Sequence, residues 1–154
     1  MKLKSLLIIA AMSLLTACMQ QGPTMTPLEI QGMQSRSYNE SYNVIFSSTM
    51  SVFQDLGYTV NSADKDAGLI SAESATDSNL AALIFTGNSL TNQTKVTAFI
   101  EKIKGKTRVR LNFVQKVETS SGYGRQSRND KPVLDAQIYQ NAFEKIENAI
   151  FLRK

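Results

Sequence analysis

Apolar and polar residues alternate along this chain with two different periods, and each period predicts a type of element. Between Tyr38 and Leu56 the apolar positions recur every three or four residues, which predicts an amphipathic helix. Ser37 followed by Glu40 has the form of a capping box at the start of this helix. Gly57 supplies the left-handed residue with which many helices end.

A second helix is predicted near the C-terminus. It begins with Asp135 as the N-cap, or slightly earlier at Pro132. Its apolar face repeats with helical spacing and comprises Ile138, Tyr139, Ala142, Phe143, Ile146, Ala149 and Ile150. Phe151 and Leu152 are expected to close the core behind this helix.

Residues 58–62 and 68–74 predict two short strands joined by a turn over 63–67. Asp64 and Asp66 in this turn have the spacing that opens many calcium loops. The glycine and the glutamate that complete an EF-hand loop are missing, however. Aspartates that bond to nearby backbone amides explain the pair better.

Residues 95–103 and 107–119 predict the clearest hairpin, with a turn over 104–106. The inward positions of its second strand are Val109, Leu111, Phe113 and Val117, and the outward ones are Arg108, Arg110, Asn112 and Lys116. One face of this strand is therefore expected to pack in the core, and the other to be solvent-exposed and basic.

The outward residues Arg108, Arg110 and Lys116 form a possible interaction surface. Lysines at 102, 104 and 106 would extend it into a positive stripe. Such a stripe would suit lipid A phosphates, peptidoglycan carboxylates or an acidic protein. A solvated sheet face explains the same pattern, so both interpretations stay open.

Two further segments have weaker patterns. Residues 75–93 contain an apolar run over 80–85, for which paired alanines and leucines favour a short helix over a strand. This segment is either a flap over one sheet edge or an exposed apolar patch that meets a partner or a membrane. Residues 120–131 predict a polar loop.

The order of these elements predicts one α+β domain over residues 36–154. We expect an antiparallel sheet of about four strands with two helices packed on one face, in the order α-β-β-β-β-α.

The N-terminus has the pattern of a bacterial lipoprotein signal. Two lysines precede an apolar stretch of about ten residues, too short for a membrane-spanning helix, and Leu-Thr-Ala-Cys at 15–18 has the form of a lipobox. Residues 1–17 are therefore expected to be removed and Cys18, the only cysteine, to be lipidated. The alternative is a plain secretory signal with a free cysteine nearby.

Residues 18–35 are then expected to be the lipidated cysteine and a flexible tether, because glycine and proline recur among polar residues. Two or more acyl chains hold a protein stably at a membrane. Residue 19 is Met and not Asp, as in lipoproteins that are sorted to the outer membrane under the enterobacterial rule. We expect an outer-membrane anchor with the domain facing the periplasm.

Composition limits the chemistry of the chain. The formal charge of +4 falls to +2 when Lys2 and Lys4 leave with the signal, a balance that indicates no nucleic-acid partner. The 154 residues include no histidine, and lipid would consume the one cysteine. Sites with Ser-His, Cys-His or His-bound zinc are thereby excluded, and no phosphate-binding glycine motif occurs. We expect no enzyme activity, cofactor or metal.

Three stretches carry a resemblance: residues 53–58, residues 66–72, and Tyr139 with Phe143, Ile146 and Phe151. They resemble small bacterial outer-membrane lipoproteins. The element order is also similar, by topology alone, to the helix-grip-like domains of the BamC-type lipoprotein of the β-barrel assembly machinery. Neither resemblance implies catalytic residues.

The lipid anchor, the tether and the missing catalytic groups together favour a non-catalytic accessory lipoprotein that docks an envelope protein complex. The alternative is a periplasmic module that binds a small apolar ligand or lipid between helices and sheet.

Overall fold

The computed structural model describes residues 25–78, 88–121 and 125–153. The expected signal peptide (1–17), Cys18 and the apolar run over 80–85 lie outside these residues.

The described residues form three helices and a seven-stranded antiparallel sheet. In chain order the elements are α2 (Pro27–Gln34), β1 (Ser35–Tyr38), α3 (Tyr42–Asp55), β2 (Tyr58–Asp64), β3 (Leu69–Ser74), β4 (Asp77–Ser78), β5 (Asn88–Ile103), β6 (Lys106–Ser121), β7 (Gln126–Pro132) and α5 (Ala136–Phe151). The strand order is β1-β6-β5-β3-β2, with β4 paired to β5 and β7 paired to β6. The α+β class is confirmed, but the sheet has seven strands where about four were expected, and a third helix precedes it.

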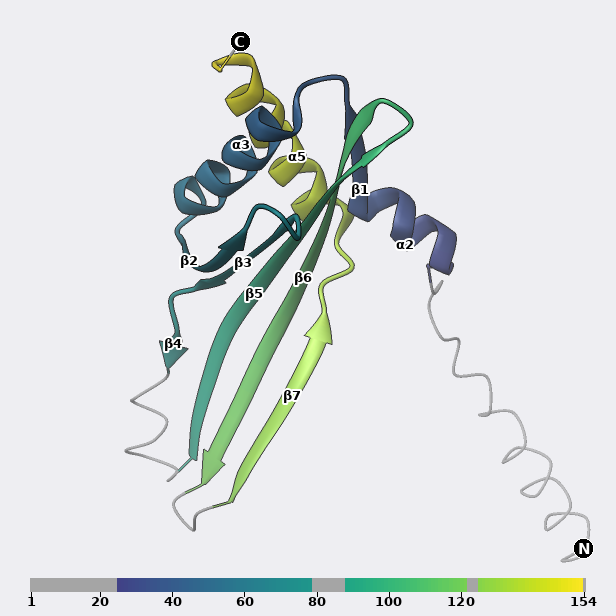
Figure 1. Cartoon of the computed structure of the whole chain (residues 1–154). Helices are drawn as coiled ribbons and strands as arrows, with labels where there is room; N and C mark the ends of the chain where they lie inside the picture. Colours follow the sequence, from purple (N-terminus) through teal and green to yellow (C-terminus); the bar gives the residue numbers. More distant parts are fainter. Residues whose placement is uncertain (1–24, 79–87, 122–124, 154) are drawn as a thin grey trace, which may run out of the picture.

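Helices α3 and α5 pack against each other over one face of the sheet, and α2 lies beside α5 (Figure 1). The residues of β3, β5 and β6 that point toward the helices are almost fully buried: Ile70, Ala72, Val96, Ala98, Ile100, Val109, Leu111 and Phe113. They pack against the buried sides of α3 and α5 to form one hydrophobic core. We call the opposite sheet face, on which the alternate residues of these strands lie, the open face.

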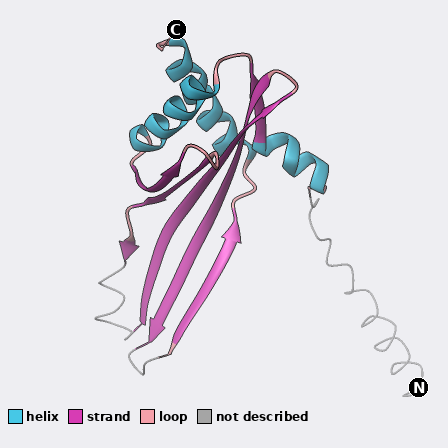
Figure 2. Cartoon of the chain, viewed as in Figure 1, coloured by secondary structure: helices cyan, strands magenta, loops and turns pink. Residues whose placement is uncertain are grey.

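The predicted hairpin is confirmed and is longer than expected. Lys104 and Gly105 both have positive φ, 49° and 79°, as a two-residue type I′ turn requires. β5 begins at Asn88, seven residues before the predicted start. Past Val96 and Phe113, the helix-side residues Thr94, Asn92 and Gln115 are polar, and Val117, which was predicted to be in the core, is only partly buried. The far end of the hairpin projects with β7 beyond the helices (Figure 2).

The flexible tether expected over 18–35 is wrong for its described C-terminal part, where residues 27–34 form α2. Thr26 is the N-cap: its hydroxyl accepts from the Glu29 amide at 3.3 Å, and the Glu29 carboxylate accepts from the Thr26 amide at 2.7 Å. Pro27 occupies the first helical turn, where its missing N–H costs nothing. This capping box was readable in the sequence, but the flanking glycines and prolines suggested a tether instead.

The capping box expected at Ser37 is also wrong. Residues 35–38 form β1, which pairs with residues 107–110 of β6, and α3 begins only at Tyr42 with Ser41 as N-cap. Strand pairing satisfies backbone groups of both β1 and β6, which a local serine cap would not do. The end of this helix was predicted correctly, because Gly57 has a φ of 82°.

The turn between β2 and β3 follows the aspartate chemistry that was expected. The Asp64 carboxylate accepts from the amides of Asp66 and Ala67 at 3.0 and 2.9 Å. Gly68 follows with a φ of 71°, and a Cβ there would lie 2.1 Å from the carbonyl oxygen of Ile100. Only glycine fits this contact between the turn and β5.

Two expectations near the C-terminus are corrected. Residues 126–132, all but the last of which lie in the expected polar loop, form β7, whose side chains are all exposed. Phe151 and Leu152 do not close the core, since 75% and 83% of their surfaces are exposed, and Ile138 is exposed as well. β7 is held by hydrogen bonds to the long β6, whereas the buried stripe of α5 ends at Ile150.

The hydroxyl of Tyr139 fills a gap in strand pairing at the edge of β6. β1 pairs with β6 up to residue 110 and β7 pairs with it from residue 114, which leaves the amide of Phe113 between them. The Tyr139 hydroxyl accepts from this amide at 3.3 Å and from Gln34 Nε2 at 3.4 Å, and donates to the Val133 carbonyl at 3.0 Å. One buried side chain thus joins α2, β6 and the start of α5.

Tyr139→Phe is expected to lower the free energy of unfolding by about 1–3 kcal/mol, because it leaves a buried amide and a partly buried carbonyl without their partner. Tyr42→Phe is the matched control. It also loses a hydroxyl hydrogen bond, to the Lys65 carbonyl, but at an exposed site where water can replace it. Denaturant unfolding measures both, and equal losses would contradict the role assigned to Tyr139.

Candidate functional site

The three basic residues predicted as a possible interaction surface lie on the open face of β6, as their alternation required. Two of them are neutralised by ion pairs. Arg108 pairs with Glu101 at 2.6 Å, and Lys116 pairs with Glu73 at 2.5 Å. Arg110 is exposed and forms no ion pair with any described residue.

The continuous positive stripe is therefore interrupted. Lys102 is not part of the stripe, because its strand partner is Thr107 and its side chain lies on the helix side of the sheet. There, the Lys102 ammonium lies 5.8 Å from the centroid of the Tyr42 ring. Lys104 and Lys106 sit at the hairpin turn. Glu101 comes from the adjacent strand β5 and Glu73 from β3, one strand further away, so that only the strand order and register reveal these pairs.

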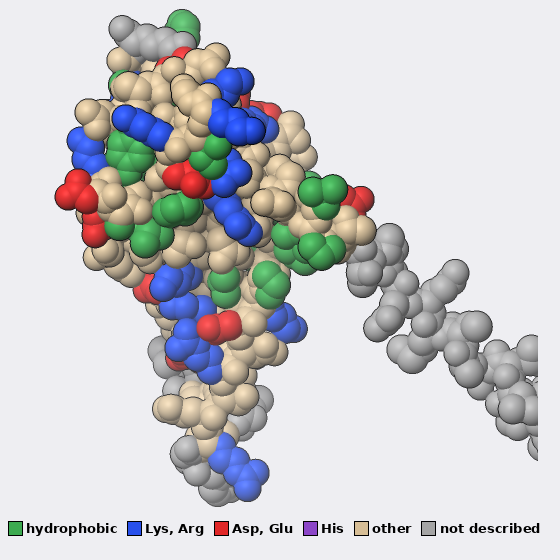
Figure 3. Space-filling view, turned by 45° about the vertical axis from the view of Figure 1, so that its right-hand side comes forward, with side chains coloured by type: hydrophobic (Ala, Val, Ile, Leu, Met, Phe, Trp, Pro, Cys, Tyr) green, Lys and Arg blue, Asp and Glu red, His purple; other side chains and the backbone are tan. Residues whose placement is uncertain are grey.

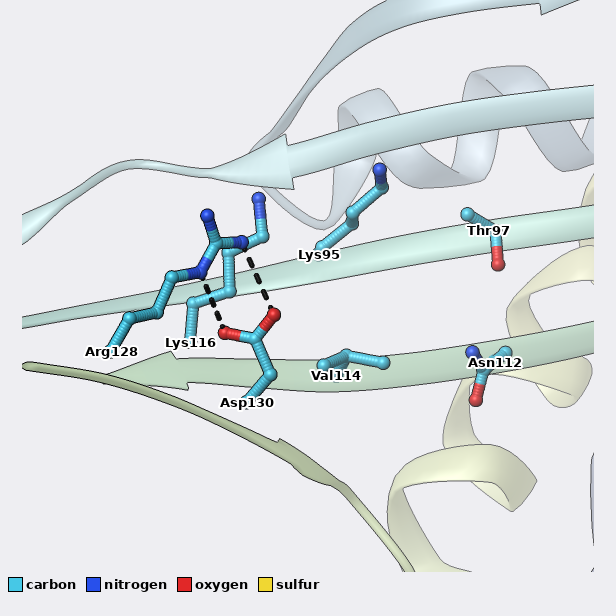
Figure 4. A pocket seen from close by; sticks show the side chains of 7 residues that line it. All are labelled: Lys95, Thr97, Asn112, Val114, Lys116, Arg128 and Asp130. Carbon is cyan, nitrogen blue, oxygen red and sulfur yellow. Dashed lines mark hydrogen bonds and ion pairs between the residues drawn. The ribbon is translucent and has the colours of Figure 1, made fainter. Parts of the chain in front are cut away.

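A depression of about 330 Å³ lies on the open face between β5, β6 and β7 (Figure 4). It is lined by Lys95, Thr97, Asn112, Val114, Lys116, Arg128 and Asp130. Arg128 makes two hydrogen bonds to Asp130, at 3.0 and 3.2 Å. Lys95 is joined to none of the residues drawn in Figure 4. Arg128 and Asp130 were not predicted as site residues, because β7 has no alternation of apolar and polar residues and was predicted to be a loop.

A second depression of about 390 Å³ adjoins the first and shares Thr97 and Asn112 with it. Its other lining residues are Gln34, Leu69, Ala98, Phe99 and Arg110. Leu69 and Phe99 are cross-strand partners with 48% and 41% of their surfaces exposed, and together they form an exposed apolar pair. We call the two depressions together the open-face groove.

The carboxylates of the groove are held in their charged form. The pKa of Glu73 is lowered chiefly by its hydrogen bond from Lys116, and the pKa of Asp130 chiefly by that from Arg128. The positive charge of Lys95 lowers both pKa values further. Both carboxylates are therefore negatively charged partners of Lys116 and Arg128 at neutral pH.

Charges of both signs are mixed along the projecting part of the molecule. In the space-filling view, Lys and Arg side chains follow the strands toward the projecting end and acidic groups are interleaved with them (Figure 3). Within the groove, Lys95, Arg110, Lys116 and Arg128 face Asp130 and the neighbouring Glu73. The groove therefore has an excess of positive charge.

The space between sheet and helices is filled by side chains. Aromatic rings contact one another in series from Phe53 through Tyr58 and Phe113 to Tyr139, with centroid distances of 6.4, 6.4 and 5.1 Å. Phe53, Phe113 and Tyr139 are at most 2% exposed. This packing makes the open face, and not the interior, the candidate for recognition.

Among the described residues, no helix has both the length and the apolar character needed to cross a membrane. The same residues contain no cluster of three or more acidic, histidine or cysteine side chains that could hold a metal ion.

Comparison with known proteins places the chain in no established family. No protein-family model and no curated protein matches the sequence. Among solved structures, the chain is similar to a DUF4468 family protein from Bacteroides ovatus ATCC 8483, with 11% sequence identity and a TM-score of 0.41. That match covers 75% of this chain and 84% of the other. A likeness at this level assigns neither family nor activity.

Proposed function

We propose that this chain is a non-catalytic lipoprotein of the bacterial outer membrane, anchored through lipid on Cys18, which docks an envelope protein through its open-face groove. The sequence resemblance to small outer-membrane lipoproteins, and the weaker likeness in element order to BamC-type domains, belong to this proposal.

One observation carries the docking part of the proposal: the groove crosses a sheet face whose exposed residues include both apolar and charged side chains. Leu69 and Phe99 offer apolar contact, and Arg110 beside them has no carboxylate partner among the described residues. Protein interfaces combine apolar or aromatic contacts with arginine in this way.

The revised N-terminal boundary shortens the tether of the proposed lipoprotein. Because α2 begins at Pro27, residues 19–26 alone separate Cys18 from helix α2. Eight residues span at most about 30 Å when fully extended. The domain would therefore stay close to the membrane surface, and its partner should be a membrane protein or a protein held at the same surface.

The alternative function, a carrier of a small apolar ligand, has less support. Such ligands occupy enclosed and mostly apolar cavities. Here the space between helices and sheet is occupied by the aromatic series that includes Phe113 and Tyr139. The open-face groove is lined largely by charged and polar side chains, which suits a polar partner better.

Arg110→Glu is expected to weaken the association of the chain with its envelope partner roughly tenfold, because one charge-assisted contact becomes a repulsion. The loss should shrink as salt rises, since exposed charges are screened over about 8–10 Å. The measurement is the fraction of the chain that migrates in a larger complex after mild detergent extraction.

Lys131→Glu is the matched control. It makes the same charge change on β7, but Lys131 pairs with Gln115 and therefore lies on the helix side of the sheet. At low salt, the fraction of the chain in the larger complex should be smaller for Arg110→Glu than for Lys131→Glu. If the two fractions are equal, the open face is a solvated surface and docking through it is wrong.

A further inference from the structure

Two cations of the open-face groove form no ion pair. Lys95 and Arg110 form no ion pair with any described residue, whereas Lys116, Arg128 and Arg108 each have a carboxylate partner. Lys95 lies near Glu73 and Asp130, but each of these carboxylates already bonds to another cation. Lys95 and Arg110 are therefore the positions at which an incoming anion would gain most.

The strand register fixes the spacing of these two cations. Lys95 lies four residues before Phe99 on β5, and Phe99 pairs directly with Arg110 on β6. At about 3.3 Å per residue along a strand and 4.8 Å between strands, their Cα atoms lie about 14 Å apart. In an extended chain, residues i and i+4 point to the same side and lie about 13 Å apart. Two carboxylates at that sequence spacing match the two cations.

The groove between these cations suits a peptide backbone. Thr97 and Asn112 are cross-strand partners midway between Lys95 and Arg110, and both line both depressions. The Asn112 amide offers a donor and an acceptor, the pair that a peptide group requires. At the Arg110 end, exposed Phe99 and Leu69 would contact an apolar side chain two residues from the carboxylate, because residues i and i+2 of an extended chain point to the same side. A single phosphate group is too small to contact both cations and the apolar pair at once.

From this geometry we infer that the open-face groove binds an extended acidic segment of a partner protein. Two carboxylates four residues apart would contact Lys95 and Arg110, with an apolar residue against Phe99. This inference rests on the proposed docking function and names the chemistry of the partner.

Fluorescence anisotropy with the full mature chain in a neutral detergent tests this directly. The probe is a labelled nine-residue peptide of serine and threonine that carries two glutamates four positions apart, with a leucine two positions beyond one of them, on the same side of an extended chain. The comparison peptides have the glutamates three positions apart, on opposite sides of an extended chain, or replaced by glutamine. We expect the first peptide to bind at least tenfold more tightly than either comparison peptide.

Lys95→Glu and Arg110→Glu should each weaken binding of this peptide at least tenfold, and Lys131→Glu should leave it within about threefold. Arg110→Gln, which removes the charge and adds none, should give an intermediate loss, and unfolding curves verify that each variant is folded. The inference would be overturned if the affinity did not depend on the glutamate spacing, or if neither Lys95→Glu nor Arg110→Glu weakened binding. So would competition by inorganic phosphate beyond that of chloride at equal ionic strength, or binding of phosphatidylglycerol vesicles in place of the peptide.

The two proposals fail separately. If the peptide does not bind but Arg110→Glu still dissociates the envelope complex, the acidic-segment inference is wrong and docking stands. If the peptide binds as described but Arg110→Glu leaves the complex intact, the proposed docking role is wrong and recognition of acidic segments stands.

Discussion

Phe143→Ala is expected to lower the free energy of unfolding by about 3–5 kcal/mol, the usual cost of removing a buried aromatic ring. Phe143 is 1% exposed at the centre of α5, and the Arg36 guanidinium from β1 lies 4.9 Å from its ring centroid. Its loss would leave a cavity between α5 and the sheet and would remove this cation–π contact. Since domains of this size are stable by about 5–15 kcal/mol, the variant should be close to unfolding.

Phe151→Ala is the control on the same helix with the same chemical change. Phe151 is 75% exposed, so the substitution should change stability by no more than about 0.5 kcal/mol. Denaturant unfolding of the two variants measures the difference between them. Comparable losses would mean that Phe151 belongs to the core, as the sequence suggested, and that the described end of α5 is wrong.

Cys18→Ser is expected to abolish lipidation and processing of the chain. Serine cannot form the thioether to diacylglycerol, so the precursor should remain uncleaved and without lipid. In detergent phase separation, the wild-type chain should partition into the detergent, and globomycin should cause its precursor to accumulate.

Met19→Ser is the matched control, because it places the same new residue one position further along and leaves Cys18 intact. This variant should be processed and should partition as the wild type does. If mature Cys18→Ser protein still enters the detergent phase, the lipoprotein assignment is wrong.

The elements that the sequence predicted well are those whose own pattern decides their structure. α5 and the main part of α3 have apolar positions at helical spacing, and the β5–β6 hairpin alternates around a Lys-Gly turn. Each of these elements buries apolar side chains in the core. Its apolar residues must therefore recur with the period of a helix or a strand, and that spacing is visible in the sequence.

The elements that were missed are strands held by a neighbour. β1 (Ser35–Tyr38) and β7 (Gln126–Pro132) are mostly polar, and each lies along β6 at the edge of the sheet. Their stability comes from backbone hydrogen bonds that the 16-residue β6 offers at positions which the central hairpin leaves unpaired. The local sequence of an edge strand does not indicate such hydrogen bonds. Helix α2 was also missed, although its capping box was visible in the sequence.

The candidate site shows the same division. Period-two alternation placed Arg108, Arg110 and Lys116 on one face of a strand. It could not indicate that Glu101 and Glu73 neutralise two of these residues, because those contacts depend on the register between strands. Lys95 and Arg110 emerge as the unpaired cations only when all neighbouring strands are in place.

Site-specific photo-crosslinking in intact cells tests the central claim most directly. A photoreactive residue at Thr97, in the middle of the open-face groove, is compared with one at Asn148, on the exposed side of α5. The proposed function predicts one discrete protein adduct from position 97, little or none from position 148, and loss of the adduct when Arg110→Glu is added. Absence of an adduct at position 97, or the same adducts from both positions, would contradict docking through the open face.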